Sequence, residues 1–188
     1  RYYTSFLLSD AGIPTPRTVV AEGFDDALEG FRRLGDVVVK PLFGSEGKGM
    51  VRVSDEDMAY RVFRALELHR YVFYLQEYIP HANEDYRAFV VGDRVIAAMR
   101  RYGKGWKTNF SQGASVEPLE LSPALQELSV EAARVVNADY AGVDLMRAED
   151  GRIYVLEINS IPGWRGLRKT TSIDIGDRVV EYVLSLIG

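Results

Sequence analysis

The segment KPLFGSEGKGM, residues 40–50, combines glycines and lysines in a way that could bind phosphate. Glycine lets the backbone approach a ligand closely, and lysine supplies positive charge. A P-loop needs four residues between its first glycine and the Gly-Lys pair, whereas only two separate Gly44 from Gly47. The dinucleotide fingerprint would need a third glycine at the position of Arg52. Two interpretations remain, a flexible glycine hairpin that covers a phosphate chain and an ordinary hairpin turn.

Lys40 favours the phosphate interpretation. It ends the apolar run VVVK directly before the loop. An ammonium group inside such a strand is costly without an anionic partner. The candidate nucleotide-binding residues of this region are therefore Lys40, Gly47, Lys48 and Gly49.

A second group of residues lies in GVDLMRAEDGRIYVLEINS, residues 142–160, and could bind a metal ion. Asp150-Gly151 is a strong signal for a two-residue hairpin turn, and centring the hairpin there places Asp144 opposite Glu157. Asn159 shares their face because strand side chains alternate. Facing carboxylates repel each other without a cation, and oxygen ligands without His or Cys indicate magnesium rather than zinc.

This hairpin argument depends on a regular ladder between the two strands. A solvent-exposed polar face on a one-sided sheet is the alternative, and a β-bulge would shift the register. On the opposite face, the alternation predicts core residues Val143, Leu145, Tyr154, Leu156 and Ile158.

Composition limits the class of protein. The chain has 188 residues, 47% of them hydrophobic and 27% charged, which suits one substantial domain or two small lobes. A net charge of −4 disfavours binding to nucleic acid or to an anionic membrane. The absence of cysteine excludes disulfides and cysteine-based zinc sites and suits a cytoplasmic location. No apolar run reaches the length of a membrane span.

The elements that must position these residues alternate between strands and helices. A capping box at Ser54 and Asp57 predicts the start of one helix, and a turn near Gly92-Asp93 joins two strands. We expect an α+β fold of two lobes with mainly antiparallel sheets, residues 1–75 and 76–188, joined near residues 76–80. The first lobe is predicted to run strand–helix–strand–strand–helix–strand, so that the glycine loop joins two strands.

Taken together, a magnesium site in one lobe and a phosphate-covering hairpin in the other resemble the ATP-grasp superfamily and, within it, the RimK-type glutamate ligases. The resemblance covers essentially the whole chain and rests on an ordered series of segments: AGIPTP, VVVKPLFGSEGKGM, LQEYI, EDYRAFVVGD, KTNF, AGVDLMR, VLEINS and KTTSIDI. It implies a nucleotide held between the lobes. It also implies a further domain before this one, because the chain opens inside a helix-like stretch.

The resemblance implies a role for each matching residue. Lys40 contacts nucleotide phosphate, and Arg87 is the catalytic candidate near the reacting phosphoryl group. The remaining roles are adenine and ribose contacts at Glu77, Tyr78 and Asp85, triphosphate contacts at Lys107, Thr108 and Asn109, and magnesium ligands at Asp144, Glu157 and Asn159.

The implied reaction uses ATP, with Mg²⁺ or Mn²⁺, to convert an acceptor carboxylate to an acyl phosphate that an amine then attacks. The amine is that of an amino acid, L-glutamate, and the acceptor is a small molecule such as a pterin or a protein C-terminus. The segment GWRGL with the glycine loop indicates the tetrahydromethanopterin branch. Ribosomal-protein glutamate ligases and the carrier-protein ligases of lysine biosynthesis are the alternatives.

Further expectations follow from the resemblance. It allows a homo-oligomer. Arg165, Arg168 and Lys169 either orient an acidic amino acid or belong to a solvated loop. A non-catalytic ATP-binding module is the alternative from another class. Residues 1–188 alone are expected to bind nucleotide without ligating.

Overall fold

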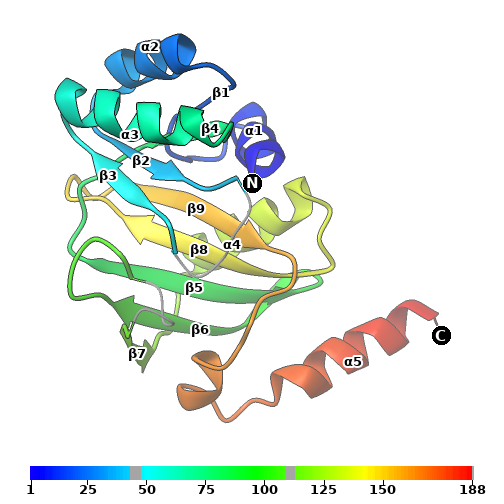
Figure 1. Cartoon of the computed structure of the whole chain (residues 1–188). Coiled ribbons are helices and arrows are strands. Elements are labelled where there is room, and N and C mark those ends of the chain that lie inside the picture. Colours follow the sequence, from blue (N-terminus) through cyan, green and yellow to red (C-terminus); the bar gives the residue numbers. More distant parts are fainter. Residues whose placement is uncertain (43–47, 109–112, 188) are drawn as a thin grey trace. The chain divides into compact units, whose positions relative to one another are not determined.

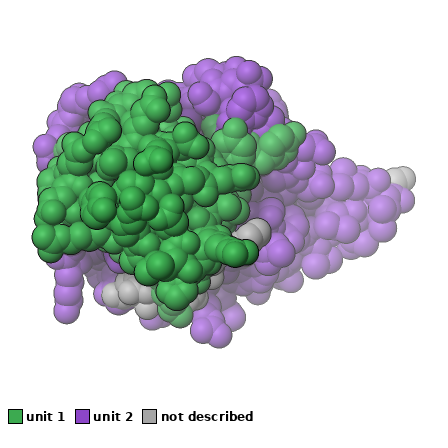
Figure 2. Space-filling view, turned by 45° about the horizontal axis from the view of Figure 1, so that its top comes forward, with its two compact units in different colours: residues 1–5, 16–80 green, residues 6–15, 81–188 purple. Residues whose placement is uncertain are grey.

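The computed structural model describes residues 1–42, 48–108 and 113–187 (Figure 1). The chain divides into two compact units (Figure 2). Unit 1 comprises Arg1–Ser5 and Pro16–Pro80, and unit 2 comprises Phe6–Thr15 and His81–Gly188. Helix α1 (Tyr2–Asp10) therefore contributes to both units. The lobe boundaries 1–75 and 76–188 concern the functional halves of the ligase fold and stay a prediction.

Unit 1 is a four-stranded sheet covered by two helices. The strands lie in the order β1-β4-β2-β3, and every neighbouring pair is antiparallel. Helices α2 and α3 pack against each other on one face of this sheet (Figure 1). The elements are β1 (Thr18–Ala21), α2 (Phe24–Leu34), β2 (Val37–Lys40), β3 (Val51–Val53), α3 (Glu56–Leu68) and β4 (Phe73–Glu77). The predicted order of elements is confirmed, and the glycine loop connects strand to strand.

The helices of unit 1 pack through the apolar positions that their sequences place on one face. Phe31 and Phe63 are buried, with ring centroids 6.5 Å apart in an edge-to-face arrangement. The prediction that Ser54 caps α3 is wrong by one residue. Asp55 is the cap, because its Oδ1 accepts the backbone N–H of Met58 at 2.8 Å. Asp and Ser serve equally well at this position, so composition alone does not separate them.

Unit 2 contains a five-stranded antiparallel sheet in the order β7-β6-β5-β8-β9 (Figure 1). Its helix α4 covers one face with a buried apolar core. The elements are β5 (Glu84–Val91), β6 (Arg94–Tyr102), β7 (Ser115–Pro118), α4 (Pro123–Val135), β8 (Tyr140–Arg147), β9 (Ile153–Asn159), the short helix η2 (Leu167–Lys169) and α5 (Ile175–Ile187). Edge strand β7 is absent from the sequence prediction. Among the described helices, none combines the length and apolar character of a membrane span.

The other face of this sheet is divided between apolar and charged side chains. Phe89 and Met99 pack with Leu167 and Ile175 in a small apolar cluster at one end. The other part of the same face carries the arginine and aspartate side chains of β5, β6 and β8. Of the predicted site residues, Asp85, Arg87 and Asp144 lie there.

Candidate functional site

The hairpin of β8 and β9 places Asp144 directly opposite Glu157, as predicted, although its loop length and its strand register both differ from the prediction. The backbone N–H of Ala148 donates to the carbonyl oxygen of Arg152 at 2.8 Å, so the loop comprises residues 149–151 rather than Asp150-Gly151 alone. A β-bulge between Asp144 and Leu145 then shifts the register by one residue. The longer loop and the bulge offset each other, and the predicted pairing is restored.

Leu156 is the additional residue of this bulge, and it changes which side chains of β9 enter the core. Val155 pairs with Leu145, and Ile158 pairs with Val143. Val155 is fully buried in the core, with Ile153 and Ile158 packed against it. The prediction that Tyr154 and Leu156 belong to this core is therefore wrong, because strict alternation does not continue through a bulge.

Arg87 and Asp144 form a paired contact across β5 and β8. The two residues are direct neighbours in the ladder. The Nε of Arg87 donates to Oδ1 of Asp144 at 2.6 Å, and its Nη2 donates to Oδ2 at 2.7 Å. This two-point geometry matches the planar guanidinium to the carboxylate and is stronger than a single hydrogen bond. The catalytic candidate and the first metal-ligand candidate are thus in direct contact.

Arg101 joins the same cluster from β6 and contacts two aspartates. Its Nε and Nη2 donate to the carboxylate of Asp85 at 2.5 and 2.6 Å, and Nη2 also lies 3.1 Å from Oδ2 of Asp144. The hydroxyl of Thr108 donates a further hydrogen bond to Asp85. The side chains of Arg101, Asp85 and Asp144 are only 3%, 5% and 7% exposed. We refer to Asp85, Arg87, Arg101, Thr108 and Asp144 as the arginine–aspartate network.

The charges of this network are buried but mutually compensated. Burial acts to raise the pKa of the Asp144 carboxyl, but the attraction of Arg101 and Arg87 and their hydrogen bonds outweigh it and lower the pKa to about 2. Burial raises the pKa of Asp85, although Arg101 opposes this effect. No buried side-chain nitrogen or oxygen among the described residues lacks a hydrogen-bond partner. Asp144 is therefore a permanent anion at neutral pH.

The donor set of this hairpin fits a hard divalent cation. Asp144 uses three of its roughly four acceptor positions for Arg87 and Arg101, which leaves one. Glu157 lies opposite on β9 and is half-buried. Asn159 accepts the N–H of Ile161 at 3.1 Å through Oδ1, and an amide oxygen has a second lone pair. Within the described ranges, no three His, Asp or Glu side chains are grouped so that they could hold a metal, so the predicted ligand set depends on Asn159 as its third member and stays a prediction.

In unit 1, Lys40 lies at the end of β2 next to the glycine loop. It is half-buried, and its Nζ donates to the side-chain oxygen of Gln76 on β4. Gln76 is buried, and its Nε2 donates to the hydroxyl of Thr18 at 3.4 Å. The energetic cost of burying this ammonium group is therefore reduced, because an amide oxygen already accepts a hydrogen bond from it.

Glu77 and Tyr78 follow Gln76 at the end of β4, and other parts of unit 1 fix their backbone. The N–H of Glu77 donates to the carbonyl of Arg17, and that of Tyr78 donates to the carbonyl of Asp36, both at 2.8 Å. The side chain of Glu77 pairs with Arg17, and the guanidinium of Arg52 lies 3.6 Å from the ring centroid of Tyr78. Because the N–H groups of Glu77 and Tyr78 are already used, an adenine base would have to contact other backbone groups of this segment.

The remaining candidates lie in loops. Two of them, Gly47 and Asn109, lie outside the described residues. Lys48 and Gly49 are exposed, and Gly49 has a φ of +75°, which favours glycine. The Nζ of Lys107 lies 5.1 Å from the ring centroid of Trp106. Arg165, Arg168 and Lys169 are exposed around η2.

Sequence reasoning missed Arg101. The signal was a second arginine inside the apolar strand RVIAAMRRY, where a buried cation needs an anion. Extending the register from the turn at Gly92-Asp93 pairs Asp85 with Arg100. A bulge between Phe89 and Val90 instead pairs Asp85 with Arg101. The correct arginine was therefore hidden by an irregularity that sequence patterns do not reveal.

Comparison with known proteins gives consistent matches. The family model described as "RimK-like ATP-grasp domain" matches residues 2–183. A tetrahydromethanopterin:alpha-L-glutamate ligase of Methanocaldococcus jannaschii is 39% identical over all of this chain and 66% of its own length. An alpha-aminoadipate–LysW ligase, LysX, of Sulfurisphaera tokodaii is 29% identical over 97% of this chain and 66% of its own length.

Solved structures match the fold. The ATP-grasp ligase PsnB, complexed with minimal precursor, Mg and ADP, has a TM-score of 0.78 at 24% identity, covering all of this chain and 58% of that one. The predicted α+β fold with antiparallel sheets is confirmed as the ATP-grasp fold. The chain spans about two thirds of the length of the curated relatives it matches.

Proposed function

Because this chain belongs to the RimK-like ATP-grasp domain family, we propose that it is the nucleotide-binding part of an ATP-dependent carboxylate–amine ligase. The full protein adds L-glutamate to an acceptor carboxylate and releases ADP and phosphate. Support comes from the name of the relative in M. jannaschii, an alpha-L-glutamate ligase.

The observation that carries this proposal is the arginine–aspartate network opposite Glu157. Phosphoryl transfer needs little covalent chemistry from the protein and depends on positioned cations that stabilise charge. Arg87 is held in place by two hydrogen bonds to Asp144, close to the proposed ligands Glu157 and Asn159. Mg²⁺, or Mn²⁺ in its place, supplies charge neutralisation and orientation of the phosphates when it is bound.

In the proposed reaction, an oxygen of the acceptor carboxylate bonds to the γ-phosphorus of ATP as the bond to the β–γ bridging oxygen breaks. The glutamate amine then bonds to the acyl carbon of the acyl phosphate, loses a proton and displaces phosphate. Arg87 stabilises charge on the transferring phosphoryl group. Lys40, Lys48 and Lys107, with Thr108 and Asn109, contact the triphosphate. Gly47 and Gly49 let the loop backbone approach it.

Glu77 and Tyr78 are assigned to adenine through backbone groups other than their N–H groups, which are already used, and Asp85 is assigned to the ribose. The acceptor is a small molecule of the pterin type, because the relative in M. jannaschii is named for tetrahydromethanopterin. The protein acts in the cytoplasm, binds neither nucleic acid nor membrane, and is compatible with a homo-oligomer.

A carrier-protein ligase is the second candidate. The relative in S. tokodaii that joins alpha-aminoadipate to LysW is also similar along nearly the whole chain. The carboxylate–amine chemistry and the candidate residues are the same, and the acceptor becomes a carrier protein. A ribosomal protein C-terminus is the remaining alternative acceptor.

The test is a turnover assay of the full-length protein with Mg-ATP and L-glutamate. We expect ADP release that depends on both glutamate and a pterin acceptor, with a product heavier by one glutamyl residue in mass spectrometry. Release with alpha-aminoadipate and a carrier protein instead would identify the second candidate. Nucleotide binding without turnover on any acceptor would show a non-catalytic module and overturn the proposal.

A further inference from the structure

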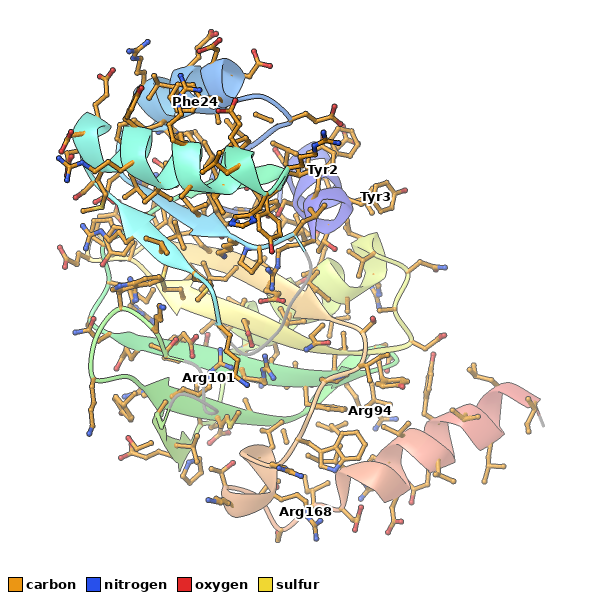
Figure 3. The ribbon with its side chains drawn as sticks, in the orientation of Figure 1. Tyr2, Tyr3, Phe24, Arg94, Arg101 and Arg168 are labelled. Carbon is orange, nitrogen blue, oxygen red and sulfur yellow. The ribbon has the colours of Figure 1, made fainter. Side chains whose placement is uncertain are left out.

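Arg101 has no role in the site described so far, yet it is the most buried charged side chain in the arginine–aspartate network. It lies within the sheet of unit 2 (Figure 3). Its side chain is 3% exposed, and its contacts are with Asp85 and Asp144. The guanidinium is thus engaged by these two carboxylates, so any effect of Arg101 on catalysis in this geometry passes through them.

The position of Arg101 requires an arginine. It lies on β6 directly opposite Asp85 of β5, and its guanidinium reaches past Asp85 to Asp144 on β8, the next strand along. Adjacent strands are about 4.8 Å apart, so the side chains of Arg101 and Asp144, with the 3.1 Å contact between them, together bridge roughly two strand spacings. A lysine provides one point charge and cannot donate in a fixed fork to two carboxylates at once.

The two arginines that hold Asp144 differ in how firmly they are held themselves. Arg87 is 13% exposed, and its side-chain hydrogen bonds within the described part of the chain are to Asp144 alone. Arg101 is fixed on its other side by two hydrogen bonds to Asp85, which is fixed in turn by Thr108. Arg101 is therefore the more firmly held of the two arginines that contact Asp144.

We propose that Arg101 is a positioning residue that keeps the Asp144 carboxylate aimed towards Glu157 for divalent-cation binding. This inference rests on the proposed function, since it concerns the same cation site. Groups that orient a metal ligand typically change metal affinity by about 10- to 100-fold when they are removed. The same range is expected for loss of Arg101.

The test is calorimetric titration of Mg²⁺ into the full-length protein saturated with ADP. Replacing Arg101 alone leaves Asp85 buried and unpaired, so the variant of choice is the double substitution Asp85→Asn with Arg101→Met, which removes the buried pair as a unit. We expect the apparent Kd for Mg²⁺ to rise about tenfold or more while the circular dichroism spectrum is retained. The single variant Arg101→Lys should bind Mg²⁺ more tightly than the double variant but more weakly than the wild type.

The matched control is Arg100→Met, one residue earlier in β6. Arg100 hydrogen-bonds Tyr102 and lies near the ring of Tyr86, away from the network, so this variant should bind Mg²⁺ like the wild type. A second control is Asp144→Asn, in which adding the double substitution Asp85→Asn with Arg101→Met should weaken Mg²⁺ binding no further, because the ligand that Arg101 positions is already lost.

The outcomes separate this inference from the proposed function. Wild-type protein that binds neither ADP nor Mg²⁺ overturns the proposed function, and with it the inference. Wild-type protein that binds both, with an unchanged Mg²⁺ affinity in the folded double variant, overturns the role of Arg101 alone. Equal weakening by Arg100→Met has the same meaning, because the effect is then not specific to the network.

Discussion

The two units use the same ion pair, arginine with carboxylate, in opposite settings. In unit 2, Arg101 and Asp85 are 3% and 5% exposed, and each has a further partner in the network. In unit 1, Arg17 and Glu77 form an equally well-aligned pair, but their side chains are 60% and 25% exposed. Water therefore competes for the second pair and is excluded from the first.

The buried pair therefore has a fixed geometry, whereas the geometry of the exposed pair can adjust. Burying charges is expensive, so a buried network persists only when all of its partners are present, and it holds each of them in one place. An exposed pair contributes little energy and rearranges at little cost. We therefore expect the proposed metal-binding and phosphoryl-transfer residues to be rigid and the adenine-contacting segment to be adaptable.

The largest expected effect tests the buried member of this comparison. Asp85→Ala leaves Arg101 buried with Asp144 as its only carboxylate partner. We expect the free energy of unfolding to fall by about 3 to 5 kcal/mol, the range for breaking one side of a buried pair. Urea denaturation of the full-length protein measures it. A loss below about 1 kcal/mol would mean that the network is no more costly to break than a surface pair.

The next effect concerns activity rather than stability. Glu157→Gln removes one of the two facing carboxylates, so we expect the magnesium-dependent rate to fall by about a hundredfold or more. The fold should be retained, since the substitution also removes the repulsion from Asp144. The exposed Glu149 of the same hairpin provides the control, and Glu149→Gln should keep wild-type turnover. Normal turnover of Glu157→Gln contradicts the metal-site assignment.

An intermediate effect is expected at Lys40. Lys40→Met leaves the buried oxygen of Gln76 without this donor, which costs roughly 1 kcal/mol, or about 2 to 4 °C in Tm. The increase in Tm on adding Mg-ATP should also shrink. Combining Lys40→Met with Gln76→Leu should restore the Tm but not the nucleotide-induced increase. An increase in Tm on adding Mg-ATP that equals that of the wild type, in either variant, excludes a contact between Lys40 and phosphate.

The smallest effect is expected at the exposed pair. Glu77→Ala should lower the free energy of unfolding by less than about 1 kcal/mol, because solvent already screens its contact with Arg17. Denaturation under the conditions used for Asp85→Ala gives the direct comparison. A loss as large as that of Asp85→Ala would remove the distinction between the two units.

Local patterns were sufficient for most elements but not for register. Apolar periodicity and glycine placement predicted the order of elements in unit 1 and the strand–loop–strand connection after Lys40. The pairing of Asp144 with Glu157 was predicted correctly although the loop was misjudged, because the bulge at Leu156 offsets the error. Bulges depend on packing across several strands, which a single segment does not encode.

The same limit explains what was missed in the site. Ser54 and Asp55 are both good helix caps, and only backbone geometry shows that Asp55 is used. Arg100 and Arg101 are chemically identical, and a bulge decides which one enters the network. Residue type indicated the chemistry, whereas tertiary packing selected the individual residue.

The unpaired Leu156 also affects how changes in chain length act on this hairpin. Deleting it leaves Val155 beside Leu145 and Glu157 beside Asp144, since neither partnership includes residue 156. Deleting Ile158 instead reverses the facing of the residues between the deletion and the bulge. Natural hairpins with and without this residue can thus present the same carboxylates, and an alignment gap at 156 is no sign of a lost site.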